Sequence, residues 1–99
     1  MERNEFVDRL KQKIDEWNND IDHLEKQLQN ASQHARIETE EKMAELRRYR
    51  DEAQARLDEA RAQSEATWEA ARARTEAAWS TLNENFRKVL DGARGGLGR

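Results

Sequence analysis

Apolar residues recur along the first third of the chain in alternating steps of three and four positions. The residues of this stripe are Val7, Leu10, Ile14, Trp17, Ile21, Leu24, Leu28, Ala31 and Ala35. A mean step of 3.5 residues is typical of the seam of a left-handed coiled coil. The pattern therefore predicts a helix that begins at Arg3 or Asn4. The large ring of Trp17 indicates either a wider packing than a two-stranded seam or a ring that lies across the backbone of the partner helix.

A second pattern repeats every eleven residues from Leu46 towards the C-terminus. Its three rows are Leu46, Leu57, Trp68, Trp79, Leu90; then Tyr49, Ala60, Ala71, Leu82, Ala93; then Ala53, Ser64, Thr75, Phe86, Leu97. Steps of three, four and four average about 3.67 residues per turn, so the stripe stays on one face of a nearly straight α-helix. The small residues Ala53, Ala60 and Ala71 would allow a close approach of another helix.

The two patterns meet in a weakly apolar stretch between Asn30 and Lys42. The heptad register fails there, because Glu38 and Lys42 would occupy seam positions, but a stutter through Thr39 and Met43 keeps the stripe continuous. No glycine or proline marks a turn, which favours an unbroken helix. The alternative is a turn with Asn30 in the left-handed conformation and Ser32 capping the next helix.

These patterns predict an all-α, elongated coiled coil with a heptad N-terminal half and an 11-residue-repeat C-terminal half. Residues 1–91 form a single helical domain with an optional turn near residues 30–36, and a continuous helix from about residue 4 to 91 would span roughly 130 Å. The alternatives are a helical hairpin or, if the chain also turns at residues 62–65, a three-helix bundle. The middle helix of that bundle would contribute little to the core and form a poor third wall of the bundle, because it has few large apolar residues.

The four glycines lie in the last eight residues of the chain. We expect the helix to end near Asp91 with Gly92 as its C-cap, and residues 92–99 to form a flexible Gly/Arg tail. Ala93 and Leu97 would then fit the 11-residue repeat only by chance.

Composition narrows the function classes. Charged residues make up 39% of the chain, and the hydrophobic class is only 35%, which favours a narrow helical seam over a deep core. The 18 basic and 21 acidic residues are interspersed, so no basic face of useful size exists for nucleic acid. The chain contains no cysteine and no apolar run long enough to span a membrane, and we expect no signal peptide because the first residues have no apolar core. A cytoplasmic location is the expectation, with a peripheral position at the inner membrane as an alternative.

Catalytic chemistry finds little support in the sequence. The only two histidines, His23 and His34, would lie about 16 Å apart on one long helix and could not share a metal ion. No glycine-rich phosphate loop and no convergent acid–base or nucleophile set is visible. The sequence therefore predicts a protein that is not an enzyme and has no catalytic, metal or cofactor site.

An aromatic and apolar face near the C-terminus is the most informative candidate site. Together with the N-terminal stripe it supplies the candidate residues for a seam or a partner surface: Trp17, Ile21, Leu24, Trp68, Trp79, Leu82, Phe86 and Leu90. Packing against another helix is the first interpretation. A lipid-surface helix flanked by Arg87 and Lys88, and an exposed patch that docks a larger protein assembly, are the other two.

Three stretches of the chain carry distinctive motifs: Leu10–Leu24 with Trp17, Glu45–Leu57, and Ser64–Trp79 with its two tryptophans. Together they resemble a family of small bacterial coiled-coil proteins known as stress-response proteins. The resemblance implies a bacterial, elongated helical protein with a part in stress tolerance, and it carries over no catalytic residue. We therefore expect a self-associating structural protein, with a dimer favoured, that docks a larger assembly through its aromatic C-terminal helix face. The alternative is a peripheral membrane-binding amphipathic helix protein.

Overall fold

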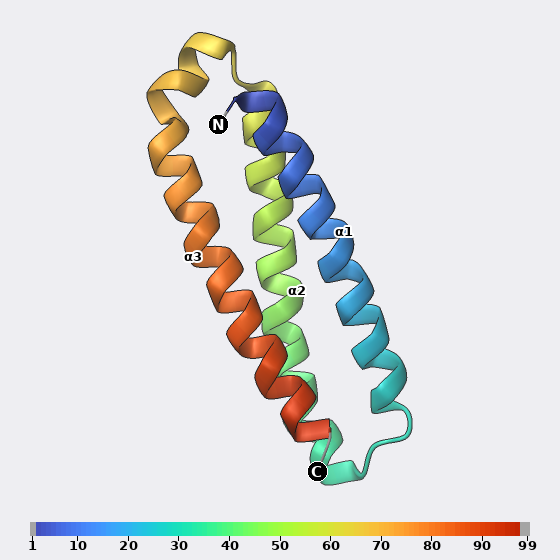
Figure 1. The fold of residues 1–99 in the computed structure, drawn as a ribbon. Helices are drawn as coiled ribbons and strands as arrows, with labels where there is room; N and C mark the ends of the chain where they lie inside the picture. The colour runs from blue at the N-terminus through green and yellow to red at the C-terminus, as the bar shows by residue number, and fades with distance from the viewer. Residues whose placement is uncertain (1, 98–99) are drawn as a thin grey trace.

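Three long helices account for nearly all of residues 2–97, the part of the chain that the computed structural model describes (side chains through residue 95). The helices are α1 (Arg3–Leu28), α2 (Gln33–Ala62) and α3 (Glu65–Leu97). They form an antiparallel bundle in which α1 and α3 run in the same direction, downwards in Figure 1, and α2 runs in the opposite direction. The bundle measures 52 × 18 × 16 Å. The all-α prediction is confirmed, and the chain adopts the three-helix alternative.

Helix α1 forms where the sequence places its N-terminal apolar stripe. Its buried residues are Phe6, Leu10, Ile14, Trp17, Ile21, Leu24 and Leu28. The stripe begins one residue earlier than predicted, because Phe6 is buried and Val7 lies half-buried at the edge. With Phe6 as its first member, the stripe steps by four, four and three residues to Trp17, which is an 11-residue step.

The first turn occupies the weakly apolar stretch at residues 29–32. The Ser32 hydroxyl accepts a hydrogen bond from the Ala35 backbone N–H at 3.3 Å, so Ser32 caps α2 as the turn alternative predicted. Asn30 does not take the left-handed conformation, since no residue in the part of the chain described, glycine included, has a positive φ. The Arg36 guanidinium instead satisfies the end of α1, donating to the carbonyls of Leu28 and Gln29 at 3.3 and 3.4 Å.

Helix α2 forms the shared wall of the bundle with mostly small or medium residues. Its buried side chains are Thr39, Met43, Leu46, Ala53, Leu57 and Ala60. The predicted continuity through Thr39 and Met43 to Leu46 is therefore a real helix face. The expectation of a poor third wall was wrong, because Ala53 and Ala60 allow close approach while α1 and α3 supply the large aromatic side chains.

The second turn lies at the other weak point, Gln63 and Ser64. Ser64 caps α3: its hydroxyl accepts from the Thr67 N–H at 3.3 Å, and the Thr67 hydroxyl donates to the Ser64 carbonyl at 3.0 Å. The Arg3 guanidinium, from the start of α1, donates to the Gln63 carbonyl. Two serine caps and cross-helix arginines thus do what glycine or proline does in most turns.

The unbroken helix from residue 4 to 91 is not what the chain forms. A single helix of that length would leave its whole apolar stripe in water, whereas folding back buries the stripe within one molecule.

The predicted end of the last helix near Asp91 was also wrong, because α3 continues through Gly92 to Leu97. Ala93 is fully buried, Lys42 Nζ donates to the Gly92 carbonyl at 3.2 Å, and Arg94 lies 3.1 Å from Asp20. These contacts hold residues 92–95 against the bundle despite the poor helix propensity of glycine. Gly98 and Arg99, the end of the predicted tail, lie outside the described residues.

Candidate interaction surface

The aromatic residues of α3 face α1, not solvent. The Trp17 and Phe86 rings stack with centroids 4.0 Å apart and planes 4° from parallel, and Trp79 stacks on the same Trp17 ring at 5.2 Å. Towards the other end of the bundle, Phe6 and Trp68 lie 5.0 Å apart. Aromatic pairs of this kind add roughly 0.5–1.5 kcal/mol each beyond the burial of their area.

The eight residues predicted for a seam or a partner surface come together in one core. Trp17, Ile21, Leu24, Trp68, Leu82, Phe86 and Leu90 are buried, and Trp79 is half-buried against them. The helix that packs on the aromatic face of α3 is thus α1 of the same chain. As the bundle stands, neither a partner protein nor a lipid surface reaches Trp68 or Phe86, whose exposed fractions are 2% and 0%.

The sequence reasoning missed Phe6 as a member of this cluster. Its position was readable, since Phe6 lies four residues before Leu10 and eleven before Trp17. The same eleven-residue step separates Trp68 from Trp79. Parallel helices that share this spacing can pair at two successive levels, and Phe6 with Trp68 and Trp17 with Trp79 do so.

The packing of α3 is uneven along its length. Between Trp68 and Leu82 no residue of α3 is fully buried, and the inward positions Ala71, Thr75 and Ala78 are half-buried. From Leu82 onwards the face is closed by Phe86, Leu90 and Ala93. The half of α3 next to the second turn is therefore held more loosely than the C-terminal half.

Polar contacts join the helices around the apolar core. Arg47 of α2 lies 2.6 Å from Glu25 of α1, and Arg50 donates to the Asn18 side chain at 3.3 Å. The Arg94–Asp20 pair joins α3 to α1. Each of these pairs is partly exposed, so each contributes at most about 1 kcal/mol. These pairs fix the register of one helix against another but add little to the free energy of unfolding.

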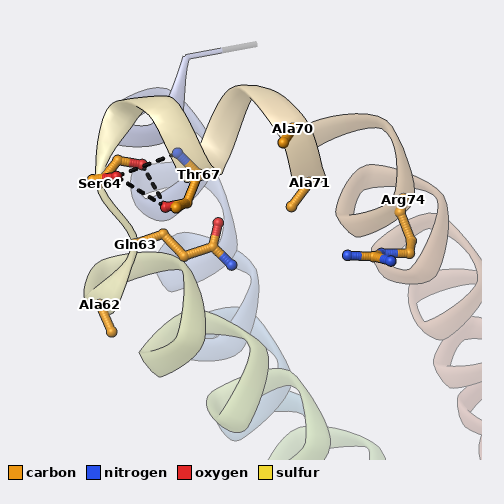
Figure 2. A pocket seen from close by; sticks show the side chains of 7 residues that line it. All are labelled: Ala62, Gln63, Ser64, Thr67, Ala70, Ala71 and Arg74. Atoms are coloured by element: carbon orange, nitrogen blue, oxygen red, sulfur yellow. Dashed lines mark hydrogen bonds between the residues drawn. The ribbon is translucent and has the colours of Figure 1, made fainter.

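A shallow hollow of about 650 Å³ lies over the second turn, lined by Ala62, Gln63, Ser64, Thr67, Ala70, Ala71 and Arg74 (Figure 2). Arg74 is the one charged group among these lining residues. The Ser64 and Thr67 hydroxyls are engaged in capping hydrogen bonds. The hollow thus contains no acid–base pair and no activated nucleophile.

The histidines lie on different helices, His23 on α1 and His34 on α2, so the distance expected along one helix does not apply. His34 is exposed and sits 3.8 Å from Glu38. Across the described residues, no three side chains of His, Cys, Asp or Glu gather where they could hold a metal ion. No helix within residues 2–97 combines the length and apolar character needed to cross a membrane.

Comparisons with protein-family models, with curated proteins and with solved structures found no match to this chain.

Proposed function

We propose that the chain is a non-enzymatic structural protein that self-associates through its helices, with the aromatic face of α3 as the binding element. The contacts between helices support this proposal, because the aromatic stacks and the cross-helix polar pairs all join one helix to another.

One observation carries the proposal. The aromatic contacts link the two ends of the chain, Phe6 and Trp17 on α1 with Trp68, Trp79 and Phe86 on α3. No short loop connects α1 to α3, so the pairing depends on surface complementarity alone. A helix from another molecule that carries the same face can therefore make the same contacts.

The partner that fits is another copy, and a dimer is favoured. The α3 face is complementary to a groove formed by α1 and α2, and a second copy carries both. Docking into a larger assembly is the extension of this proposal, and it requires a partner that presents a similar apolar groove.

The cellular context in the proposal is a cytoplasmic bacterial protein with a part in stress tolerance. This part rests on the sequence resemblance alone. The lipid-surface alternative would require α3 to leave α1 and expose Trp68 and Phe86, and no contact among the described residues favours it.

Sedimentation equilibrium over a wide concentration range tests the proposal. We expect a reversible monomer–dimer equilibrium, and a monomer at every concentration would refute self-association. Flotation with anionic vesicles is the companion experiment. Protein that remains at the bottom of the gradient is the expected result, whereas co-flotation would favour the membrane alternative.

A further inference from the structure

The turn between α2 and α3 is short and contains no helix-breaking residue. Only Gln63 and Ser64 separate the two helices, and neither is glycine or proline. Gln63 has φ −82° and ψ 144°, so its φ is already close to the helical value and a rotation of ψ brings it into the helix. Glutamine is also a good helix former.

The 11-residue repeat passes through this turn without a break in register. Leu57 and Trp68 are separated by eleven residues across the turn, as Trp68 and Trp79 are within α3. Straightening the turn would therefore keep one apolar face along a continuous helix over residues 33–97, about 97 Å long. If the turn only ever stayed closed, the apolar residues on its two sides would not need to keep the 11-residue spacing of a continuous helix.

Few interactions hold the turn closed. They include the Ser64–Thr67 capping bonds, the bond from the Arg3 guanidinium to the Gln63 carbonyl, and the bond from the Gln63 N–H to the Ala60 carbonyl at 3.3 Å. The Gln63 side-chain oxygen is buried without a hydrogen-bond partner among the described residues, which destabilises the closed form. The adjacent half of α3, from Trp68 to Leu82, is also the loosely packed half.

We propose that the α2–α3 turn is a hinge, and that in the dimer each copy places its α3 in the α1–α2 groove of the other. The occupant of the groove is thus α3 of a second copy. The Phe6–Trp68, Trp17–Phe86 and Arg94–Asp20 contacts re-form between copies, and only the turn changes. Exchange of an identical element is a low-cost route to a dimer. This inference rests on the proposed self-association and specifies how it occurs.

Hinge variants test the inference by size-exclusion chromatography with mass determination, after incubation at high concentration. Ser64→Ala removes the N-cap of α3, which stabilises only the closed turn, and alanine favours a continuous helix. Because each of the two chains in the dimer has one such hinge, the dimer association constant should rise roughly tenfold or more. Glu65→Pro places proline at the first position of α3, where it is tolerated. In a continuous α2–α3 helix the same proline would lie in the helix interior and break it. It should lower the dimer association constant by more than about a hundredfold.

Gln33→Pro is the matched control, because it places proline at the first position of α2 and locks the other turn. It should dimerise like the wild type. If Glu65→Pro dimerises as the wild type does, the hinge is refuted while self-association stands. If the wild type never dimerises, both proposals fail.

A second measurement covers the case in which a proline variant fails to fold. Chains with a wild-type hinge that carry a donor dye at Asp20→Cys are mixed with chains that carry an acceptor dye at Arg94→Cys. In an exchanged dimer these positions adjoin across copies, so energy transfer should be strong in the dimer fraction. Absence of transfer in that fraction would overturn the inference.

Discussion

Trp17 of α1 and Phe86 of α3 stack almost face to face, with ring centroids 4.0 Å apart, although they lie 69 positions apart in the sequence. Both side chains are almost completely buried. This contact defines how the third helix meets the first, and with Trp79 it forms the centre of the aromatic cluster.

Phe86→Ala should destabilise the bundle by about 3–5 kcal/mol, because it removes a fully buried ring and leaves a cavity beside Trp17. Urea unfolding followed by circular dichroism measures this change. Ile37→Ala is the control, since Ile37 is 55% exposed and its loss should change the free energy of unfolding by less than about 0.5 kcal/mol. Similar costs for both variants would contradict the assigned core.

The three tryptophans should differ in solvent access. Trp17 and Trp68 are buried, whereas Trp79 is half-buried. The acrylamide quenching constant of the tryptophan fluorescence of the monomer should therefore be lower for Trp79→Phe than for the wild type. For Trp68→Phe, which removes a buried tryptophan, it should be higher than for the wild type. Equal quenching constants for the two variants would mean that the α3 face is not closed as described.

Removal of residues 92–99 should destabilise the bundle, because Ala93 is buried and Lys42 and Asp20 contact this segment. We expect the free energy of unfolding to fall by about 1–2 kcal/mol, which is the typical cost of losing a small buried side chain and one hydrogen bond. Arg94→Ala, which removes only a partly exposed ion pair, should cost less than about 1 kcal/mol. Thermal unfolding compares the two, and a truncated chain as stable as the wild type would indicate a flexible tail.

Ser32→Ala should cost about 0.5–2 kcal/mol, since it removes the side-chain acceptor at the N-terminus of α2. Ser80→Ala is the matched control, as Ser80 is exposed within α3 and alanine has the higher helix propensity. Denaturant midpoints of the two variants should move in opposite directions. A shift in the same direction would argue against the Ser32 cap.

The sequence predicted the helical faces well because apolar periodicity is a local property. The stripe from Leu10 to Leu28 is buried as spaced, and so are Leu46, Leu57, Trp68 and Leu90 of the 11-residue row, in which Trp79 is half-buried. Both weak points in the pattern became turns, and Ser32 was readable as a cap.

The choice between one helix and three was not local. It depends on contacts such as Phe6–Trp68, whose partners lie 62 positions apart and whose pairing no periodicity reveals. The end of α3 was missed for the same reason, since Lys42 and Asp20 hold the Gly92–Arg94 segment from other helices. Arg47 is spaced to pair with Asp51 four residues further along its own helix, but its guanidinium lies against Glu25 of α1, a contact that local spacing does not reveal.

The placement of α3 beside α1 is the central claim, and a spin-label distance between Asp20→Cys and Arg94→Cys in one chain tests it most directly. Measuring the doubly labelled chain at a concentration at which sedimentation shows only monomer isolates the intramolecular distance. The bundle predicts a distance in the shortest range that the method resolves, because these side chains touch at 3.1 Å. A single continuous helix would instead separate the labels by about 110 Å, and the absence of any short distance would contradict the fold.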